Sequence, residues 1–226
     1  MGGERFQPQG DSRPVDSAWP YAVWPPPSDV VLTGTWVDLR PTTADDAREL
    51  FAALDHDQVW AHVRGRPATP DAMAAIIDAK RDDVAWFPWT VRLRRAIGVK
   101  PAGAVVGATS YLETTPIDAR SEIGSTTYDP AVWGTQVNPE CKLLLLAYAF
   151  DNLSMGRVQF RTDVRNHRSQ QAIARLGATY EGVLRRYQRR SDDSVRDTVL
   201  FSILAEEWPA LCRGLEDRLS AYAPST

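Results

Sequence analysis

The sequence predicts an α/β fold in which a mixed, mostly antiparallel central sheet of about seven strands is flanked by helices. Seven short segments have the composition or the period-two alternation of strands, and five segments have the apolar spacing or the capping residues of helices. Their order is strand, two helices, three strands, helix, strand, helix and two strands, after which the fifth helix follows. Short polar or glycine-containing turns join two pairs of strands as antiparallel hairpins.

A chain of 226 residues can bury one core, and its length favours a single domain. Residues 1–30 contain six of the sixteen prolines and no hydrophobic periodicity. We therefore expect a flexible, Pro-rich N-terminal arm over residues 1–30 and one domain over residues 31–226. Packing of this arm across the domain or a partner subunit is the alternative, because it is rich in aromatic residues: Phe6, Trp19, Tyr21 and Trp24.

Composition and charge exclude several classes of function. A formal net charge of −3 recruits no nucleic acid, and the basic string over residues 185–190 is more often a solvated face than an RNA contact. Cys141 and Cys212 form no disulfide framework, and neither cysteines nor histidines show metal-binding spacing, so no metal is expected. Without a long apolar run or a signal peptide, we expect a cytoplasmic protein with no membrane partner.

The first half of the domain begins with a strand over residues 35–41. Thr42 and Thr43 follow as caps of an amphipathic helix that runs through Leu54. Thr69 and Pro70 then mark the start of a second helix, whose apolar residues lie on one face: Met73, Ile76 and Ile77. The loop between the helices is rich in charged and aromatic residues.

Three strands come next along the chain. Residues 86–94 and 105–112 alternate apolar and polar side chains, and the turn between them contains glycine and proline, which predicts a hairpin with a longer loop. Residues 121–128 form the next strand, which Asp129 and Pro130 end.

A central helix follows. Asn138 is a candidate N-cap with Pro139 at the first helical position, and the helix should run to about Leu153. Residues 143–150 are apolar without a break, so we expect this helix to lie between two layers of the domain. Its N-terminus presents free N–H groups and a positive dipole end, which favours either a phosphate-bearing cofactor or an ordinary capped helix.

The C-terminal part contains a strand over residues 157–162, a short helix that Asn166 opens and Gly177 ends, and a hairpin of residues 183–189 and 197–204. The last helix spans Glu206 to about Leu219. We detect no internal repeat.

Two stretches of this chain carry a family resemblance: WGTQVNPECK, from Trp133, and RNHRSQQAIARLGATYEGVLR, from Arg165. They resemble the acyl-CoA-binding half of the GNAT N-acetyltransferases, and in particular the ribosomal-protein N-terminal (RimJ/RimL-type) acetyltransferases. The resemblance covers about residues 33–208, and its specific part is 121–185. The usual GNAT loop, Q/R-x-x-G-x-G/A, reads Trp133, Gln136 and Asn138 at its three positions, which resembles a variant of this branch.

This resemblance implies a GNAT fold that binds acetyl-CoA. The pyrophosphate would lie on the loop residues Gly134, Thr135, Gln136, Val137 and Asn138. Asn166 would hold the pantetheine amides, and unpaired backbone N–H groups around Thr126, Thr127 and Tyr128 would hold the pantetheine chain and the thioester oxygen, where two strands splay apart. A fully paired strand, and a purely capping role for Asn166, are the alternatives. The loop over residues 55–67 would help to shape the acceptor site.

The resemblance also suggests two catalytic residues. Glu122 stands where many GNAT enzymes carry the carboxylate that accepts the proton of the amine, although a glutamate in a strand often only forms a salt bridge. Ser169 is the candidate that donates a hydrogen bond or proton to the coenzyme A sulfur, with Tyr180 and Tyr187 as rivals.

We therefore expect an acyl-CoA-dependent N-acyltransferase that moves an acetyl group from acetyl-CoA to the primary amine of a protein N-terminus or small molecule, by direct attack in a ternary complex. An aminoglycoside- or polyamine-type acetyltransferase is one alternative, for which an acidic acceptor pocket could use Asp55, Asp57, Glu113 and Glu122. A non-catalytic acyl-CoA sensor or interaction domain is the other. A homodimer is expected from the aromatic arm and from this branch of the family.

Overall fold

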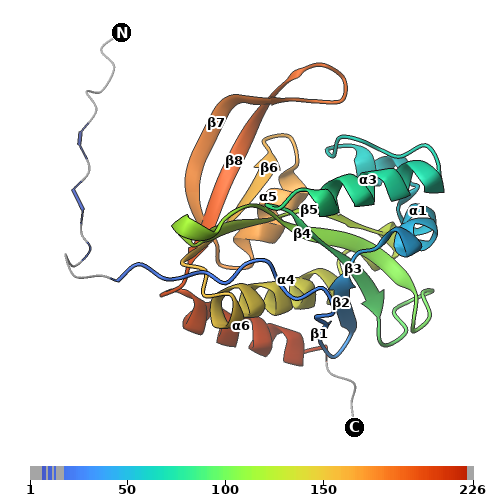
Figure 1. The fold of residues 1–226 in the computed structure, drawn as a ribbon, viewed down its shortest axis with the longest axis horizontal. Helices are drawn as coiled ribbons and strands as arrows, with labels where there is room; N and C mark the ends of the chain where they lie inside the picture. The colour runs from blue at the N-terminus through green and yellow to red at the C-terminus, as the bar shows by residue number, and fades with distance from the viewer. Residues whose placement is uncertain (1–6, 9, 12, 14–17, 223–226) are drawn as a thin grey trace.

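The computed structural model describes residues 7–8, 10–11, 13 and 18–222. Its centre is one eight-stranded sheet in the order β1-β2-β3-β4-β5-β6-β8-β7 (Figure 1). All neighbouring strands are antiparallel except β5 and β6, which are parallel. The predicted mixed, mostly antiparallel sheet is confirmed.

The strands coincide with the seven predicted segments, with one addition. Their bounds are β1 (Leu32–Thr33), β2 (Val37–Pro41), β3 (Phe87–Leu93), β4 (Val105–Thr115), β5 (Arg120–Tyr128), β6 (Arg157–Asp163), β7 (Thr179–Arg189) and β8 (Val195–Leu204). The additional strand, β1, has two residues, which is too short for an alternating pattern to reveal.

The helices also follow the prediction, with short additions. They are α1 (Ala47–Leu54), α2 (Asp57–Trp60), α3 (Pro70–Asp82), α4 (Val137–Ala147), α5 (His167–Ala174) and α6 (Trp208–Ser220), and the single turns are η1 (Ala44–Asp46), η2 (Pro116–Asp118), η3 (Pro130–Val132) and η4 (Tyr148–Asn152). Within the described ranges, no helix is both long and apolar enough to cross a membrane.

Helices cover both faces of the sheet (Figure 1). α1 and α3 pack on one face around a small core that includes Leu50, Met73 and Ile77. The larger core lies on the other face, where α4 contacts β1 and β2 on one side and α6 on the other. The prediction that the apolar central helix lies between two layers is therefore confirmed.

The start of α4 differs from the prediction. The helix begins at Val137 with Gln136 at the N-cap, so the assignment of Asn138 as N-cap is wrong. The Thr135 hydroxyl accepts a hydrogen bond from the Val137 N–H at 3.3 Å and so takes the capping role earlier in the chain. Pro139 still lies in the first turn, where its missing N–H costs nothing.

The end of the predicted central helix has a different geometry. α-Helical hydrogen bonding stops at Ala147, and η4 is a π-helical turn. The Leu153 N–H donates to the Tyr148 oxygen at 2.9 Å, five residues back, which closes this turn. Together the two segments reach the predicted end.

Glu140 attaches the β1–β2 hairpin to α4. Its buried carboxylate accepts hydrogen bonds from the N–H groups of Thr35 at 2.7 Å and of Trp36 and Val37 at 2.8 Å. A Cβ on Gly34 would lie only 2.5 Å from the carboxyl carbon, so this approach requires glycine. One charge therefore satisfies three backbone donors that the hairpin leaves unpaired.

The described part of the N-terminal arm contacts the domain through two tryptophans. The Trp24 indole N–H donates to the Val84 oxygen at 2.7 Å, and that of Trp19 donates to the Ile117 oxygen at 3.1 Å. Phe6 lies outside the described residues. The division of the chain at residue 30 and the flexibility of the arm stay predictions.

Glu140→Gln keeps the size of the side chain but removes its charge. It also places the amide NH₂ of glutamine, a donor, against the backbone N–H donors of the hairpin. We expect the free energy of unfolding to fall by roughly 2–4 kcal/mol, as for loss of charge-assisted hydrogen bonds to buried groups. Urea unfolding followed by tryptophan fluorescence measures it. Glu206→Gln, at an exposed glutamate, is the control and should change stability by less than about 0.5 kcal/mol. Equal effects of both substitutions would contradict the role of Glu140.

Candidate functional site

The sheet opens between β5 and β6. Their parallel ladder begins with Arg120 opposite Arg157 and ends with Glu122 opposite Gln159, and no described residue of β5 beyond this point pairs with β6. We call the opening between residues 123–128 and β6 the fork. Backbone groups that face it have no ladder partner and must find other hydrogen bonds. The predicted splaying of these strands is confirmed.

A bulge on β5 shapes the fork. The β4–β5 register shifts after Ala108, and Ser125 has a φ of +48°, which is uncommon and strained for a residue with a Cβ. Farther along, the Asp129 N–H donates to the Val106 oxygen at 2.8 Å. Because N–H directions alternate along a strand, the N–H of Tyr128 faces the fork instead.

The loop before α4 presents a row of unpaired N–H groups. No described residue accepts a hydrogen bond from the backbone N–H of Gly134, Thr135, Gln136 or Asn138. The positive end of the helix dipole adds to these donors, and the φ of Gly134 is +76°. An anion such as a phosphate fits this arrangement.

The N-terminus of α5 adds a cap, a hydroxyl and a cation. Asn166 Oδ1 accepts a hydrogen bond from the Ser169 N–H at 3.1 Å, which makes Asn166 the N-cap. Its side-chain NH₂ and the Ser169 hydroxyl have no hydrogen-bond partner among the described residues, so both can reach a ligand. The Arg168 guanidinium lies 3.5 Å from the centre of the Trp133 ring.

Trp133 joins these parts at the open end of the fork. Its indole N–H donates to the Tyr128 oxygen at 3.0 Å, while Arg168 covers its ring. The end of β5, the α4 loop and the start of α5 therefore meet. The residues that the sequence assigns to cofactor binding belong to these three segments: Thr126, Thr127, Tyr128, Gly134, Thr135, Gln136, Val137, Asn138, Asn166 and Ser169.

Glu122 lies at the closed end of the fork, in the last rung of the ladder. Its buried carboxylate accepts a hydrogen bond from Gln159 Nε2 at 3.3 Å and forms an ion pair with Arg161. A Cβ on Gly124 would lie 2.7 Å from Glu122 Oε1, so glycine is needed there. Burial raises the pKa of Glu122 to about 7, although the charge of Arg161 opposes this shift. This carboxyl group can therefore take up or release a proton near neutral pH.

Arg161 connects Glu122 to two further groups. Its guanidinium, on a side chain only 6% exposed, also bonds to the Glu113 carboxylate and the Tyr187 hydroxyl. The Arg161 cluster is defined here as Glu113, Glu122, Arg161 and Tyr187. With both carboxylates ionised, the four members of the cluster carry one net negative charge, which favours a cationic group nearby, and Arg196 is one cation that already interacts with Glu122. The ion pair considered as the alternative role of Glu122 is thus present, and its role as a base stays a prediction.

Other predicted candidates lie away from this cluster. Tyr180 packs edge-on against Phe201, with ring centres 5.7 Å apart, and is 59% exposed. Asp55 and Asp57 form ion pairs with Arg66 at 2.7 and 2.5 Å. The four carboxylates considered as one acidic pocket therefore form two separate groups.

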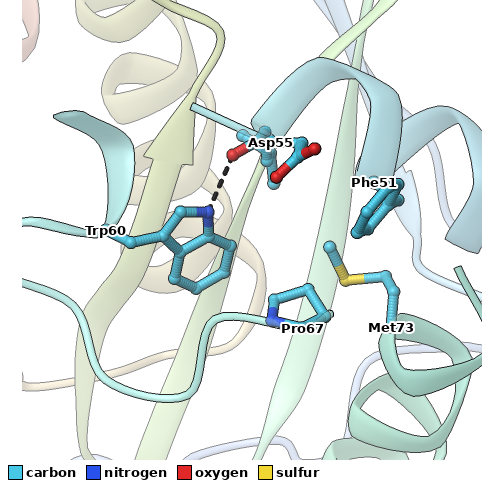
Figure 2. A pocket seen from close by; sticks show the side chains of 6 residues that line it. Phe51, Asp55, Trp60, Pro67 and Met73 are labelled. Atoms are coloured by element: carbon cyan, nitrogen blue, oxygen red, sulfur yellow. Dashed lines mark hydrogen bonds between the residues drawn. The ribbon is translucent and has the colours of Figure 1, made fainter. Parts of the chain in front are cut away.

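The connection between α1 and α3 forms a shallow hollow (Figure 2). The Trp60 indole N–H donates to the Leu54 oxygen at 2.7 Å, which fixes the indole at the edge of the hollow. The walls of the hollow are Phe51, Leu54, Asp55, Trp60, Pro67 and Met73. These side chains fill the hollow, so it has no room for a ligand.

Sequence reasoning did not find every charged residue of the site. Arg161 alternates with apolar residues along its strand, which suggested a solvent-facing side chain, and only the fold reveals that it is buried between carboxylates. Lys142 offered a clearer signal, because it is a cation within an otherwise apolar helix. The described residues contain no cluster of three or more metal-binding side chains, and the absence of a metal stays a prediction.

Comparison with known protein families identifies a match for more than half of this chain. The family model of the acetyltransferase (GNAT) domain matches residues 37–179. The uncharacterized N-acetyltransferase p20 of Bacillus licheniformis is 28% identical over 117 residues, which are 51% of this chain and 64% of that protein, so the chain spans less than two thirds of this relative.

Solved structures share the whole fold. A GNAT-family protein from Chromobacterium violaceum ATCC 12472 has a TM-score of 0.79 and 28% identity, over 90% of this chain and 99% of that chain. Mycobacterium smegmatis RimJ in complex with CoA-disulfide has a TM-score of 0.69 and 22% identity, over 84% of this chain and 91% of that chain.

Arg161→Met leaves the Glu122 carboxylate buried without a cation. We expect the free energy of unfolding at pH 8 to fall by roughly 3–5 kcal/mol, as when one partner of a buried pair is removed. The loss should be smaller at pH 5.5, because the pKa of Glu122 is raised in the folded state and the stabilising effect of protonation disappears as pH rises. Urea unfolding at pH 8 and at pH 5.5 measures the loss of stability under each condition.

The double variant Glu122→Gln/Arg161→Met serves as control, because it removes the buried charge as well. It should recover most of the stability lost at pH 8. A single Arg161→Met variant with the same loss at both pH values would mean that packing, not charge, explains its effect.

Proposed function

Because the chain belongs to the GNAT acetyltransferase family, we propose that it transfers an acetyl group from acetyl-CoA to a primary amine. The observation that supports this most strongly is the fork with its unpaired N–H groups, placed beside the free N-terminus of α4. An extended, amide-containing chain that ends in a pyrophosphate matches both parts. We infer that coenzyme A is this ligand.

The residues at the open end have distinct roles in this proposal. The unpaired N–H groups of Gly134, Thr135, Gln136 and Asn138 bind the pyrophosphate, and Arg168 supplies a cation close to them. The Asn166 amide and the fork-facing N–H groups of residues 126–128 hold the pantetheine and the thioester oxygen. When bound, acetyl-CoA supplies the acetyl group as an activated thioester.

The Arg161 cluster and α5 provide the groups that transfer protons in this proposal. An alkyl ammonium has a pKa of about 10, so only its minor neutral form attacks a thioester at neutral pH. We infer that Glu122, with a pKa of about 7, accepts the amine's proton directly or through water. Ser169 or Tyr187 donates a hydrogen bond to the departing sulfur; Tyr187 is the tyrosine that contacts the cluster.

We favour a protein N-terminus as the acceptor. The negative cluster at the closed end suits a protonated amine on its approach, and one similar fold is RimJ. Asp55 and Asp57 pair with Arg66, in a group separate from the Arg161 cluster, so the four carboxylates do not form one acidic pocket, which weakens the case for a polycationic aminoglycoside or polyamine. A non-catalytic coenzyme A sensor would bind the cofactor without turnover.

Glu122→Gln keeps the shape of the side chain but cannot accept a proton. We expect turnover to fall by roughly 10²- to 10⁴-fold, the range for a lost general base. The remaining rate should rise with pH as more amine becomes neutral, without the increase near pH 7 that ionisation of Glu122 gives the parent. A thiol-release assay with acetyl-CoA and succinyl-CoA against peptides, polyamines and aminoglycosides measures this and identifies the acceptor.

Calorimetry with acetyl-CoA separates binding from chemistry. Glu122→Gln should bind acetyl-CoA like the parent, whereas Asn138→Pro removes one N–H of the loop and should bind it more weakly. Binding without turnover on any acceptor would support the sensor, and no binding by the parent would refute the proposal. A Glu122→Gln enzyme with parental turnover from pH 6 to 9 would restrict this residue to structure.

A homodimer is also part of the proposal, because Trp19 and Val23, in the described part of the arm, are 60% and 58% exposed and could pack against a second copy. Light scattering at micromolar concentration should give twice the mass of one chain, and deletion of residues 1–30 should reduce it. A single-chain mass for the parent would refute the dimer.

A further inference from the structure

All three lysines of this chain contact one stretch of β5 and the residue that follows it. The sequence contains 26 lysines and arginines, of which only three are lysines. Each of the three bonds to a residue between positions 125 and 129, the region of the bulge and the fork. The contacts are Lys80 Nζ to Ser125 Oγ at 3.0 Å, Lys142 Nζ to Thr126 Oγ1 at 2.8 Å, and Lys100 Nζ to Asp129 Oδ2 at 2.5 Å.

Two of these lysines reach the bulge from opposite layers. Lys80 belongs to α3 and Lys142 to α4, which cover different faces of the sheet. Ser125 and Thr126 are consecutive, and successive side chains of a strand point to opposite faces. Lys142 also donates to Thr109 Oγ1 at 3.3 Å, so it bridges β4 and β5. The bulge is thus held between two ammonium groups.

Neither ammonium group has a counter-ion. No described carboxylate lies within 4 Å of Lys80 or Lys142, whereas Lys100 is paired with Asp129. Lys142 is 5% exposed, and Lys80 lies 5.0 Å from the centre of the Trp86 ring. Burial of an unpaired charge is unfavourable, and a fold keeps one mainly where the charge has a use.

We propose that Lys80 and Lys142 are positioning residues for acyl transfer, which hold the β5 bulge from both faces and place positive charge beside the fork. Negative charge develops on the thioester oxygen as the amine adds to the carbonyl, and fixed positive charge close to it lowers the energy of that state. The inference rests on the proposed function, because it assumes that the thioester lies in the fork.

The use of lysine at these two positions agrees with this role. Burial lowers the pKa of both side chains to about 8. An arginine would stay charged at every working pH and would need room for a planar guanidinium, whereas lysine is a compact charge on a flexible stem. At Lys142, which is only 5% exposed, a compact cation suits the restricted space.

Cys141 and Tyr128 titrate above the range in which Lys142 does. Burial raises the pKa of Cys141, on the same helix, to about 12, and that of Tyr128, on β5, well above its usual value. Glu140 is occupied by three backbone N–H groups of the hairpin. Burial is the cause of the shift at Lys80, and no charged side chain of the described residues pairs with it.

Lys142→Met and Lys80→Met remove the charges and keep the length of the side chains. Replacement of an unpaired buried charge by an apolar group should leave thermal stability equal or higher. We expect kcat nevertheless to fall about tenfold, less than the 10²- to 10³-fold loss of a direct oxyanion donor, with unchanged acetyl-CoA affinity by calorimetry. Lys100→Arg, which retains its ion pair, is the matched control and should keep parental kcat.

The pH profile gives a test that a merely structural lysine would not pass. If the charges assist the reaction, the parental rate relative to that of the Met variants should decline above about pH 8, as the ammonium groups lose their protons. Lys80→Arg and Lys142→Arg should move this decline to higher pH, since a guanidinium stays protonated. Met variants with parental kcat, or an unchanged decline in both Arg variants, would overturn the proposal.

Nuclear magnetic resonance of ¹⁵N-labelled lysine offers a measurement on the unaltered protein. Three side-chain signals are expected, and the Lys→Arg variants assign them. The signals of Lys80 and Lys142 should titrate near pH 8 and shift when coenzyme A is added. If calorimetry detects coenzyme A but neither signal responds, this inference fails while the proposed function stands. If the parent binds no coenzyme A, the proposed function itself fails.

Discussion

Two parallel strands that separate within a sheet leave backbone donors and acceptors that neither strand can satisfy, and this constraint governs the site. β5 and β6 share a ladder only as far as Glu122 and Gln159. The bulge at Ser125 turns β5 away, and the Trp133 indole bonds to the Tyr128 carbonyl where β5 ends. The free N-terminus of α4 lies beside this end. The opening is therefore fixed on several sides, and a ligand that supplies hydrogen-bonding groups completes it.

Charge is distributed unequally along this opening. At one end, the helix N-terminus and Arg168 favour an anion. At the other end, the two carboxylates of the Arg161 cluster outnumber their arginine. In the proposed function, a phosphate-bearing donor and a cationic acceptor are directed to different ends of the fork, with the reacting carbonyl between them. This separation supports the proposal of a ternary complex, in which neither substrate must leave before the other binds.

Much of the fold could be predicted because its signals are local. The strands β3, β4 and β6 and the caps at Thr69 and Asn166 each depend on a few neighbouring residues, and the structure confirms them. The start of α4 was misjudged, because Asn138 resembles a cap in sequence whereas the helix begins at Val137, with Gln136 at the N-cap and the Val137 N–H bonded to Thr135.

The site was predictable only where it is made of backbone. The loop before α4 and the start of α5 depend on local sequence, and both lie at the open end of the fork as expected. The partners of Glu122 could not be read from sequence, because Arg161 and Tyr187 come from strands that meet it through the sheet order. The same holds for Lys80 and Lys142, which lie 62 positions apart and contact adjacent residues of β5.

The scarcity of lysine has a consequence for the surface of the molecule. Thioesters acylate neutral amines without help from an enzyme, whereas guanidinium groups remain protonated and unreactive. Of the three lysines, Lys142 is buried, Lys80 lies against a tryptophan, and Lys100 is tied to a carboxylate. Arginine supplies nearly all the other positive charge. A protein built in this way keeps its charge and its solubility in the presence of a reactive acyl donor, because its exterior offers few lysine amines for spontaneous damage.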